Sequence, residues 1–194
     1  MKRCKLYIDY LGTRYCGWQR QPEQDTIQEQ IEKVLAQVLG SSISIYGQGR
    51  TDSGVHALHQ TAHVDLDETV DIEKLRYALL GLLPRDIAVW KISEVSPDFH
   101  ARFDAKNRSY IYRIIRRPSA HYSATANLVL QDLSIPKMNE CADLLPGRHD
   151  FRNFSKVNDS QKNTSCNIEI SEWSENDFLL EYRITANRFL RHLV

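Results

Sequence analysis

Polar and apolar residues follow two different periods in the first half of the chain. Residues 5–10 alternate between polar and apolar, a period typical of a half-buried β-strand. Apolar residues then recur every three or four positions over residues 27–39, which predicts a helix. Thr26 and Glu29 form a capping box at its start, and Gly40 supplies its stop.

Three further strands and a second helix are predicted before residue 100. Residues 42–46, 61–66 and 87–92 are predicted strands, and residues 72–82 carry a helical apolar stripe that Pro84 ends. The predicted order is strand, helix, strand, strand, helix, strand. This order is typical of the split βαβ, ferredoxin-like arrangement, in which an antiparallel sheet carries helices on one face.

The second half begins again with a strong strand. The pattern predicts a strand, a long loop, a helix and two strands over residues 109–116, 120–134, 136–145, 165–173 and 178–186. A further helix is predicted to begin at Asn187, which leaves this half short of closing elements. We therefore expect an α+β protein with two ferredoxin-like halves and an active-site cleft between them. Residues 1–103 would form the half that carries the catalytic loop, and residues 104–194 an incomplete C-terminal half.

Length and composition narrow the class of protein. A chain of 194 residues can bury a real core, and 25 basic against 25 acidic residues argue against an indiscriminate polyanion binder. No run of about 18 apolar residues could span a membrane. Charges within the first ten residues argue against a secretory signal, so we expect a cytoplasmic protein with no membrane partner. Four widely separated cysteines predict free or buried thiols.

One loop with three glycines carries the strongest candidate chemistry. Gly47, Gly49 and Gly54 can adopt unusual backbone angles and let a ligand approach the main chain. The loop could thus direct Arg50 and Asp52 at one object, although the same residues also suit an ordinary turn. Because the glycine spacing fits neither a dinucleotide fingerprint nor a P-loop, nucleotide cofactors lose their main sequence support.

Several separated motifs occur in a single order along the chain. They are GRTDSGVHA at 49–57, FHARF at 99–103, RSYIYR at 108–113, HDFRNFS at 149–155 and NRFLRHLV at 187–194. Together with the opening segments 7–13 and 17–21, they resemble the TruA-type tRNA pseudouridine synthases over essentially the whole chain. Five motifs in one order are far more specific than any one of them.

The resemblance implies an isomerase that converts uridine to pseudouridine in the anticodon arm of tRNA, at positions 38 to 40, with no cofactor and no metal. It implies that Asp52 is the catalytic nucleophile, that Arg50 helps to extrude the nucleotide, and that Tyr110 packs on the target base. It also implies a homodimer whose subunits form basic clefts for one tRNA. We expect RNA contacts from Arg20, Arg102, Arg108, Arg113 and Arg188.

The chemistry of the reaction suits these residue types. Isomerisation breaks the C1′–N1 bond and forms a C1′–C5 bond, and a stacked, paired base hides these atoms. Extruding the base costs a few kcal/mol, which an inserted arginine and an aromatic ring on the extruded base can offset. An ionised carboxylate could then attack either C1′ or C6 and form a covalent intermediate. Tyr110, or a water beside it, would remove the C5 proton.

Other interpretations of the same residues remain open. Tyr110 beside Tyr112 also suits core packing. Three histidines at positions 56, 59 and 63 suit a metal only on one helix, and the last falls in a predicted strand. The alternative functions are a noncatalytic RNA-binding module, whose usual strand signature is missing, and a hydrolase, which would need a partnered histidine or a metal.

The end of the last motif also bears on activity. In the family this motif continues with an arginine just after the position of Val194, and that arginine pairs with the catalytic aspartate. The sequence stops before it. We therefore also expect that the chain could be an inactive synthase fragment or could dimerise poorly.

Overall fold

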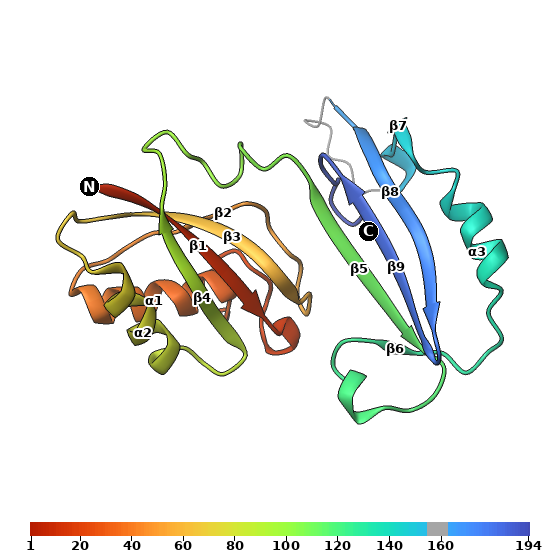
Figure 1. Cartoon of the computed structure of the whole chain (residues 1–194), viewed down its shortest axis with the longest axis horizontal. Coiled ribbons are helices and arrows are strands. Elements are labelled where there is room, and N and C mark those ends of the chain that lie inside the picture. Colours follow the sequence, from red (N-terminus) through yellow and green to blue (C-terminus); the bar gives the residue numbers. More distant parts are fainter. Residues whose placement is uncertain (155–162) are drawn as a thin grey trace. The chain divides into compact units, whose positions relative to one another are not determined.

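The computed structural model describes residues 1–154 and 163–194 (Figure 1). Contacts between residues divide the chain into two compact units, Met1–Ala105 and Lys106–Val194. Within the described residues there are a four-stranded sheet, a five-stranded sheet and three α-helices, so the chain is an α+β protein as predicted. None of these helices has the length and apolar character needed to cross a membrane.

The first unit has the predicted order of strands and helices. Its elements are β1 (Lys2–Tyr10), α1 (Ile27–Leu39), β2 (Tyr46–Gly47), β3 (Ala57–Leu66), α2 (Ile72–Leu82) and β4 (Ile87–Glu94). The strands lie in the order β2-β3-β1-β4, and all their pairings are antiparallel. Figure 1 shows α1 and α2 together on one side of this sheet.

Local signals in the sequence set the helix boundaries of this unit. The Thr26 side chain accepts a hydrogen bond from the Glu29 N–H (3.4 Å) and caps α1, as the capping box predicts. Gly40 ends α1 with a left-handed φ of 70°, a conformation that costs glycine little. Asp71 caps α2 by accepting from the Lys74 N–H (3.1 Å).

The core of the first unit lies between the sheet and its helices. From Cys4 to Tyr10 every second residue of β1 is buried, and the residues between them are partly exposed, as the alternation in the sequence predicts. The buried residues of β1 and α1 include Cys4, Leu6, Ile8, Tyr10, Ile27, Ile31 and Leu35. Because one sheet face and two helices enclose this core, the loops at the sheet edge have a rigid support.

The predicted strand over residues 42–46 is wrong for most of its length. Only Tyr46 and Gly47 pair with β3. The Ile45 N–H donates to Glu32 Oε1 (2.9 Å), and the Ile45 carbonyl accepts from Gln28 Nε2 (3.1 Å). Side chains of α1 therefore occupy the backbone groups that a longer strand would use for its ladder.

The second unit contains one α-helix and five strands in its described residues. They are β5 (Arg108–Ile115), β6 (Asn127–Leu128), α3 (Ile135–Ala142), β7 (Gly147–Asp150), β8 (Ser165–Asn176) and β9 (Leu179–Ala186). The strand order is β6-β5-β9-β8-β7, with β5 and β6 parallel and the other pairs antiparallel. Figure 1 shows α3 beside β8, with which it packs.

Two short strands of this unit were not predicted. β6 lies within the predicted loop 120–134, and β7 lies between the predicted helix 136–145 and the predicted strand 165–173, where no element was predicted. All four residues of β7 are exposed, so the strand has no buried face and leaves no alternation of apolar residues to detect. Its pairing with β8 supplies the hydrogen bonds that hold it.

The helix predicted from Asn187 is also wrong. The Asn187 N–H donates to the Asn167 carbonyl (3.2 Å), which extends strand pairing, and His192 has a left-handed φ of 63° that is incompatible with a helix. Leu190 is buried with Phe151 and with residues of β8 and β9. Leu190 thus packs on the core of the second unit although residues 187–194 form no helix.

Candidate active site

The loop between β2 and β3 holds Arg50 and Asp52, and both side chains are exposed. Both residues belong to the first unit. The Gln48 N–H donates to the Thr61 carbonyl (2.8 Å), and Gln60 Nε2 donates to the Gly49 carbonyl (2.9 Å). Hydrogen bonds to β3 therefore fix the start of the loop. The loop carries a carboxylate and a guanidinium two residues apart.

Backbone hydrogen bonds hold the loop on both sides of the candidate nucleophile. The Trp18 N–H donates to the Thr51 carbonyl (3.1 Å), and the Gly54 N–H donates to the Tyr15 carbonyl (3.3 Å). The same Tyr15 carbonyl accepts from Ser53 Oγ (3.2 Å). Residues 12–19, which follow β1 and are called the supporting segment below, thus fix the residues immediately before and after position 52. This limits the positions that the Asp52 carboxylate can take.

Two further contacts fix the same loop through side chains. The hydroxyl groups of Tyr10 and Thr51 form a hydrogen bond (2.9 Å), and Tyr10 is only 4% exposed. The Gly12 N–H donates to Nδ1 of His56 (3.1 Å). His56 therefore acts as a hydrogen-bond acceptor for the backbone of the supporting segment. None of these contacts was visible in the sequence, because each joins residues about 40 positions apart.

Glycines let the supporting segment approach the loop closely. A Cβ atom on Gly12 would overlap the Val55 carbonyl oxygen, and one on Gly17, where φ is +83°, would overlap the Thr51 carbonyl oxygen. A Cβ atom on Gly47 would lie 2.6 Å from the indole nitrogen of Trp18. By contrast, a Cβ atom on Gly49 would meet open space. Close packing of the supporting segment on the loop therefore requires Gly12 and Gly17 more than it requires Gly49. Sequence reasoning did not single out Gly12 or Gly17.

The guanidinium of Arg50 has a neutral partner. Its Nε–H donates to Oε1 of Gln19 (3.1 Å), which belongs to the same supporting segment. An amide oxygen orients the guanidinium without neutralising its charge, so the positive charge remains available to a ligand. The candidate site thus combines an exposed carboxylate with an oriented cation.

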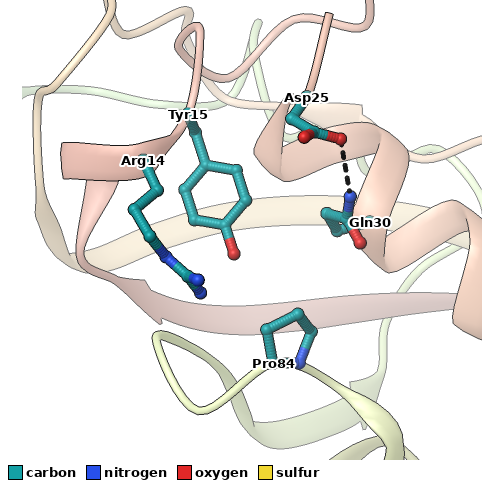
Figure 2. A pocket seen from close by; sticks show the side chains of 5 residues that line it. All are labelled: Arg14, Tyr15, Asp25, Gln30 and Pro84. Carbon is teal, nitrogen blue, oxygen red and sulfur yellow. Dashed lines mark hydrogen bonds between the residues drawn. The ribbon is translucent and has the colours of Figure 1, made fainter.

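A pocket of about 320 Å³ is lined in part by the supporting segment, and none of the predicted site residues lines it. Figure 2 shows its lining of Arg14, Tyr15, Asp25, Gln30 and Pro84, with Asp25 bonded to Gln30. Asp86 accepts from the Tyr15 hydroxyl (2.8 Å) and from Arg14 (2.7 Å). Burial, together with the bond to Asp86, raises the pKa of Tyr15 to about 12. These paired groups stabilise the segment that supports the loop.

Two of the arginines that we predicted to bind RNA lie elsewhere in the first unit. Arg20 donates to Glu32 Oε2 (2.8 Å); the Arg20 side chain is 55% exposed, and that of Glu32 is only 6% exposed. The guanidinium of Arg102 lies 6.0 Å from the ring centroid of Phe103. Both arginines therefore already have an interaction within the unit.

The second unit positions Tyr110 on β5, where its side chain is partly buried. Its ring and that of Phe189 form a T-shaped pair, with centroids 5.1 Å apart and an interplanar angle of 87°. Arg113, on the same strand, forms an ion pair with Glu181 (2.7 Å), its register partner on β9. Arg108 donates to the Asn187 carbonyl (2.9 Å). Residue pairing across the sheet, which no motif encodes, thus decides the partner of Arg113.

Arg188 lines a second pocket, of about 310 Å³, in the same unit. The lining residues are Arg148, Asn163, Ser165, Cys166, Asn167, Asn187 and Arg188. Two guanidinium groups and several amides, without a carboxylate among these residues, suit an anionic group. Ser155, the last residue of the motif at 149–155, lies outside the described residues. In the described part of the chain, no three histidine, cysteine or acidic side chains could together hold a metal ion.

Comparison with known proteins gives a consistent family. The model of the family described as tRNA pseudouridine synthase matches residues 6–104 and 141–194. Asp52, Arg50 and Arg188 lie in the matched ranges, and Tyr110 lies between them. The chain is similar over its whole length to the tRNA pseudouridine synthase A of Chlorobium limicola, at 40% identity over 80% of that protein.

Two more relatives agree. The protein of the same name from Bacteroides fragilis is 40% identical over 100% of this chain and 78% of its own length. That of Azobacteroides pseudotrichonymphae is 38% identical, with the same coverage of both chains. The resemblance predicted from the motifs is thereby confirmed: the chain belongs to the tRNA pseudouridine synthase family, and its enzyme class is that of an isomerase.

Proposed function

We propose that this protein converts uridine to pseudouridine at positions 38 to 40 in the anticodon arm of tRNA, with Asp52 as the nucleophile. The observation that carries the proposal is the fixed position of an exposed carboxylate. Hydrogen bonds from Trp18 and Gly54 hold the backbone on both sides of Asp52, and the side chain itself extends from a loop with little freedom. A nucleophile with a fixed position reaches its target carbon at a small entropic cost.

In the proposed reaction the carboxylate attacks C1′ of the ribose, or C6 of the uracil, and forms a covalent bond. The C1′–N1 bond breaks, the uracil rotates, and C1′ forms a bond to C5, while the bond to Asp52 breaks and returns the carboxylate. The proton on C5 then leaves, and N1 gains a proton, so that uridine and pseudouridine have the same composition. The family and the fixed carboxylate support both points of attack equally.

We assign Arg50 to the space that the target nucleotide leaves. Its guanidinium has an orienting contact with Gln19 and no neutralising partner in that contact, which suits a cation that meets displaced base edges and phosphates. Tyr110 belongs to the second unit, and we assign it to stacking on the target base. Its partly exposed ring supports this role, because stacking requires one accessible face. Either Tyr110 or a water beside it would remove the C5 proton.

We further propose that the protein acts as a cytoplasmic homodimer without cofactor or metal, and that its units are the two ferredoxin-like halves predicted from the sequence. The β1-α1-β2-β3-α2-β4 order of the first unit supports this description. The proposed RNA contacts are those of Arg20, Arg102, Arg108, Arg113 and Arg188. The pocket that Arg148 and Arg188 line supports a phosphate contact at the last of these.

Mapping the product on tRNA tests the proposed activity and its positions. The protein is incubated with an unmodified tRNA transcript, and pseudouridine is located by carbodiimide labelling and primer extension. We expect stops that report pseudouridine at positions 38 to 40, and their loss in transcripts in which those uridines are replaced by cytidine. Product at other uridines would contradict the positions. Tight binding of tRNA with no product at any uridine would favour a noncatalytic module or an inactive fragment.

A further inference from the structure

A continuous chain of hydrogen bonds joins Arg50 to a buried carboxylate of α1. Arg50 Nε donates to Gln19 Oε1 (3.1 Å), and Gln19 Nε2 donates to Gln28 Oε1 (2.9 Å). Gln28 Nε2 in turn donates to Glu32 Oε1 (2.9 Å). Every donor in this chain is directed toward Glu32, which is 5% exposed. All residues of this series of hydrogen bonds belong to the first unit.

The backbone fixes the orientation of each amide in this chain. Gln28 Oε1 accepts from the Arg20 N–H (3.1 Å), and Gln28 Nε2 donates to the Ile45 carbonyl (3.1 Å). Since a backbone N–H can only donate and a carbonyl can only accept, the Gln28 amide has one satisfactory orientation. Gln19 must then present its Nε2 to Gln28, which leaves its Oε1 to accept from Arg50.

Glu32 completes the chain at the helix. Gln28 and Glu32 are four residues apart on α1 and therefore share one helix face. The Glu32 carboxylate accepts from Gln28, from the Ile45 N–H (2.9 Å) and from Arg20 (2.8 Å). A buried carboxylate is costly unless charged and polar partners surround it, and here they do. Gln28 and Glu32 thus hydrogen-bond the backbone of Ile45, just before the loop. Through Gln19 the same helix face also orients the side chain of Arg50.

We propose that Gln19, supported by Gln28 and Glu32, is a positioning residue that holds the Arg50 guanidinium ready to occupy the space of the extruded nucleotide. The inference rests on the proposed function of this loop. Gln19 uses a single N–H of Arg50, one of the five that a guanidinium offers, and it is neutral. It therefore sets the direction of the cation while leaving its charge and its other donors for RNA.

A double-mutant cycle tests this proposal, with Arg50→Ala, Gln19→Leu and the combination of both. Gln19 is partly exposed, and loss of its contact with Arg50 leaves Gln28 its backbone partners, so the variant is expected to fold. The matched control is Gln21→Leu, because Gln21 is two positions away, is exposed, and bonds only the Cys16 carbonyl among the described contacts. Single-turnover rate constants and the Kd for tRNA are measured for each protein.

We expect Gln19→Leu to lower the single-turnover rate constant about tenfold, since a misdirected group loses much of its effect, and to change the Kd less than about twofold. In the Arg50→Ala background, the same change should lower the rate constant less than about twofold, because its target is gone. Gln21→Leu should have no effect in either background.

Equal losses from Gln19→Leu in the presence and absence of Arg50 would overturn the proposal, because Gln19 would then act independently of Arg50. An unchanged rate constant for Gln19→Leu would overturn it as well. Failure of the proposed function itself is recognised separately, because in that case the unaltered protein would form no pseudouridine. Thermal unfolding of each variant identifies a loss that comes from unfolding, and in that case the shorter replacement Gln19→Ala repeats the cycle.

Discussion

Arg50 and Arg113 were both predicted to meet RNA, but the two units of the molecule treat them differently. In the first unit, Arg50 has a neutral amide as its partner at 3.1 Å. In the second, Arg113 forms an ion pair with Glu181 at 2.7 Å across neighbouring strands. The comparison indicates that one arginine keeps its full charge and a set direction, whereas the other has its charge largely compensated before any ligand arrives.

The surroundings of the two arginines differ in the same sense. The loop of Arg50 is held by hydrogen bonds from Tyr10, Gly12 and Trp18, which lie far away in the sequence. Arg113 lies within a regular strand, where the register decides its partner. A side chain that must act on one atom requires the first arrangement, and a side chain that attracts a backbone phosphate can tolerate the second.

Replacement of each arginine by alanine should give the largest difference between the two, in the rate constant and in the Kd for tRNA. Arg50→Ala should lower the single-turnover rate constant about 100-fold and change the Kd for tRNA less than about threefold, because its role is at the reacting nucleotide. Arg113→Ala should leave the rate constant at saturating protein unchanged and should weaken binding. Quench-flow and filter-binding measurements give the two quantities. A rate constant unaffected by Arg50→Ala would remove the proposed role of Arg50.

Substitution of the glycines tests whether the loop is held as tightly as the contacts indicate. Gly12→Ala would force a Cβ atom onto the Val55 carbonyl, so we expect the free energy of unfolding to fall by about 1–3 kcal/mol. Gly49→Ala is the control, because its Cβ atom would meet open space. Urea unfolding measures both variants. Equal free energies of unfolding for Gly12→Ala and the unaltered protein would show that the supporting segment can shift away from the loop at little cost.

The pH dependence of the support can be tested through Tyr15. Its pKa is raised to about 12 by burial and by its bond to Asp86. A raised pKa in the folded state means that the stabilisation is complete below about pH 10, the pKa of an unfolded tyrosine, and is lost as the pH rises toward 12. Between pH 10 and 11 the unaltered protein should lose about 1 kcal/mol more than Tyr15→Phe.

Urea unfolding of both proteins at pH 8, 10 and 11 gives this difference. The phenylalanine variant cannot ionise at position 15, so all other groups that titrate in this range contribute equally to both proteins. If the two proteins lost the same free energy between pH 10 and 11, Tyr15 would not be protected from ionisation by its burial.

The smallest expected effect comes from Glu181→Gln, which removes the partner charge of Arg113. The freed charge should tighten tRNA binding about twofold to threefold and steepen the slope of log K against log salt by up to about 1. Asp67→Asn serves as the control for the change in net charge, because Asp67 bonds only Thr69 among the described side-chain contacts. An unchanged slope would remove Arg113 from the RNA interface.

Sequence patterns predicted those features that depend on neighbouring residues. The cap at Thr26 and the stop at Gly40 are local, and the structure has both where the sequence places them. The motif around Arg50 and Asp52 likewise identified the loop, because its residues are contiguous.

Several features that sequence reasoning missed depend on distant partners. The strand before Tyr46 is short because Gln28 and Glu32 bind the backbone of Ile45. The support of the loop by Gly12 and the pairing of Arg113 each join residues at least about 40 positions apart. No period or motif of one sequence records such pairs, so the structure was needed to find them.

Release of tritium from tRNA labelled at C5 of uracil tests the central claim most directly, because pseudouridine formation must expel that hydrogen. The protein is compared with Asp52→Asn, which keeps the size of the side chain and removes its negative charge. We expect release by the unaltered protein, and a rate at least about 1000-fold lower for the variant, at an unchanged Kd for tRNA. Release by Asp52→Asn at the rate of the unaltered protein would contradict the account.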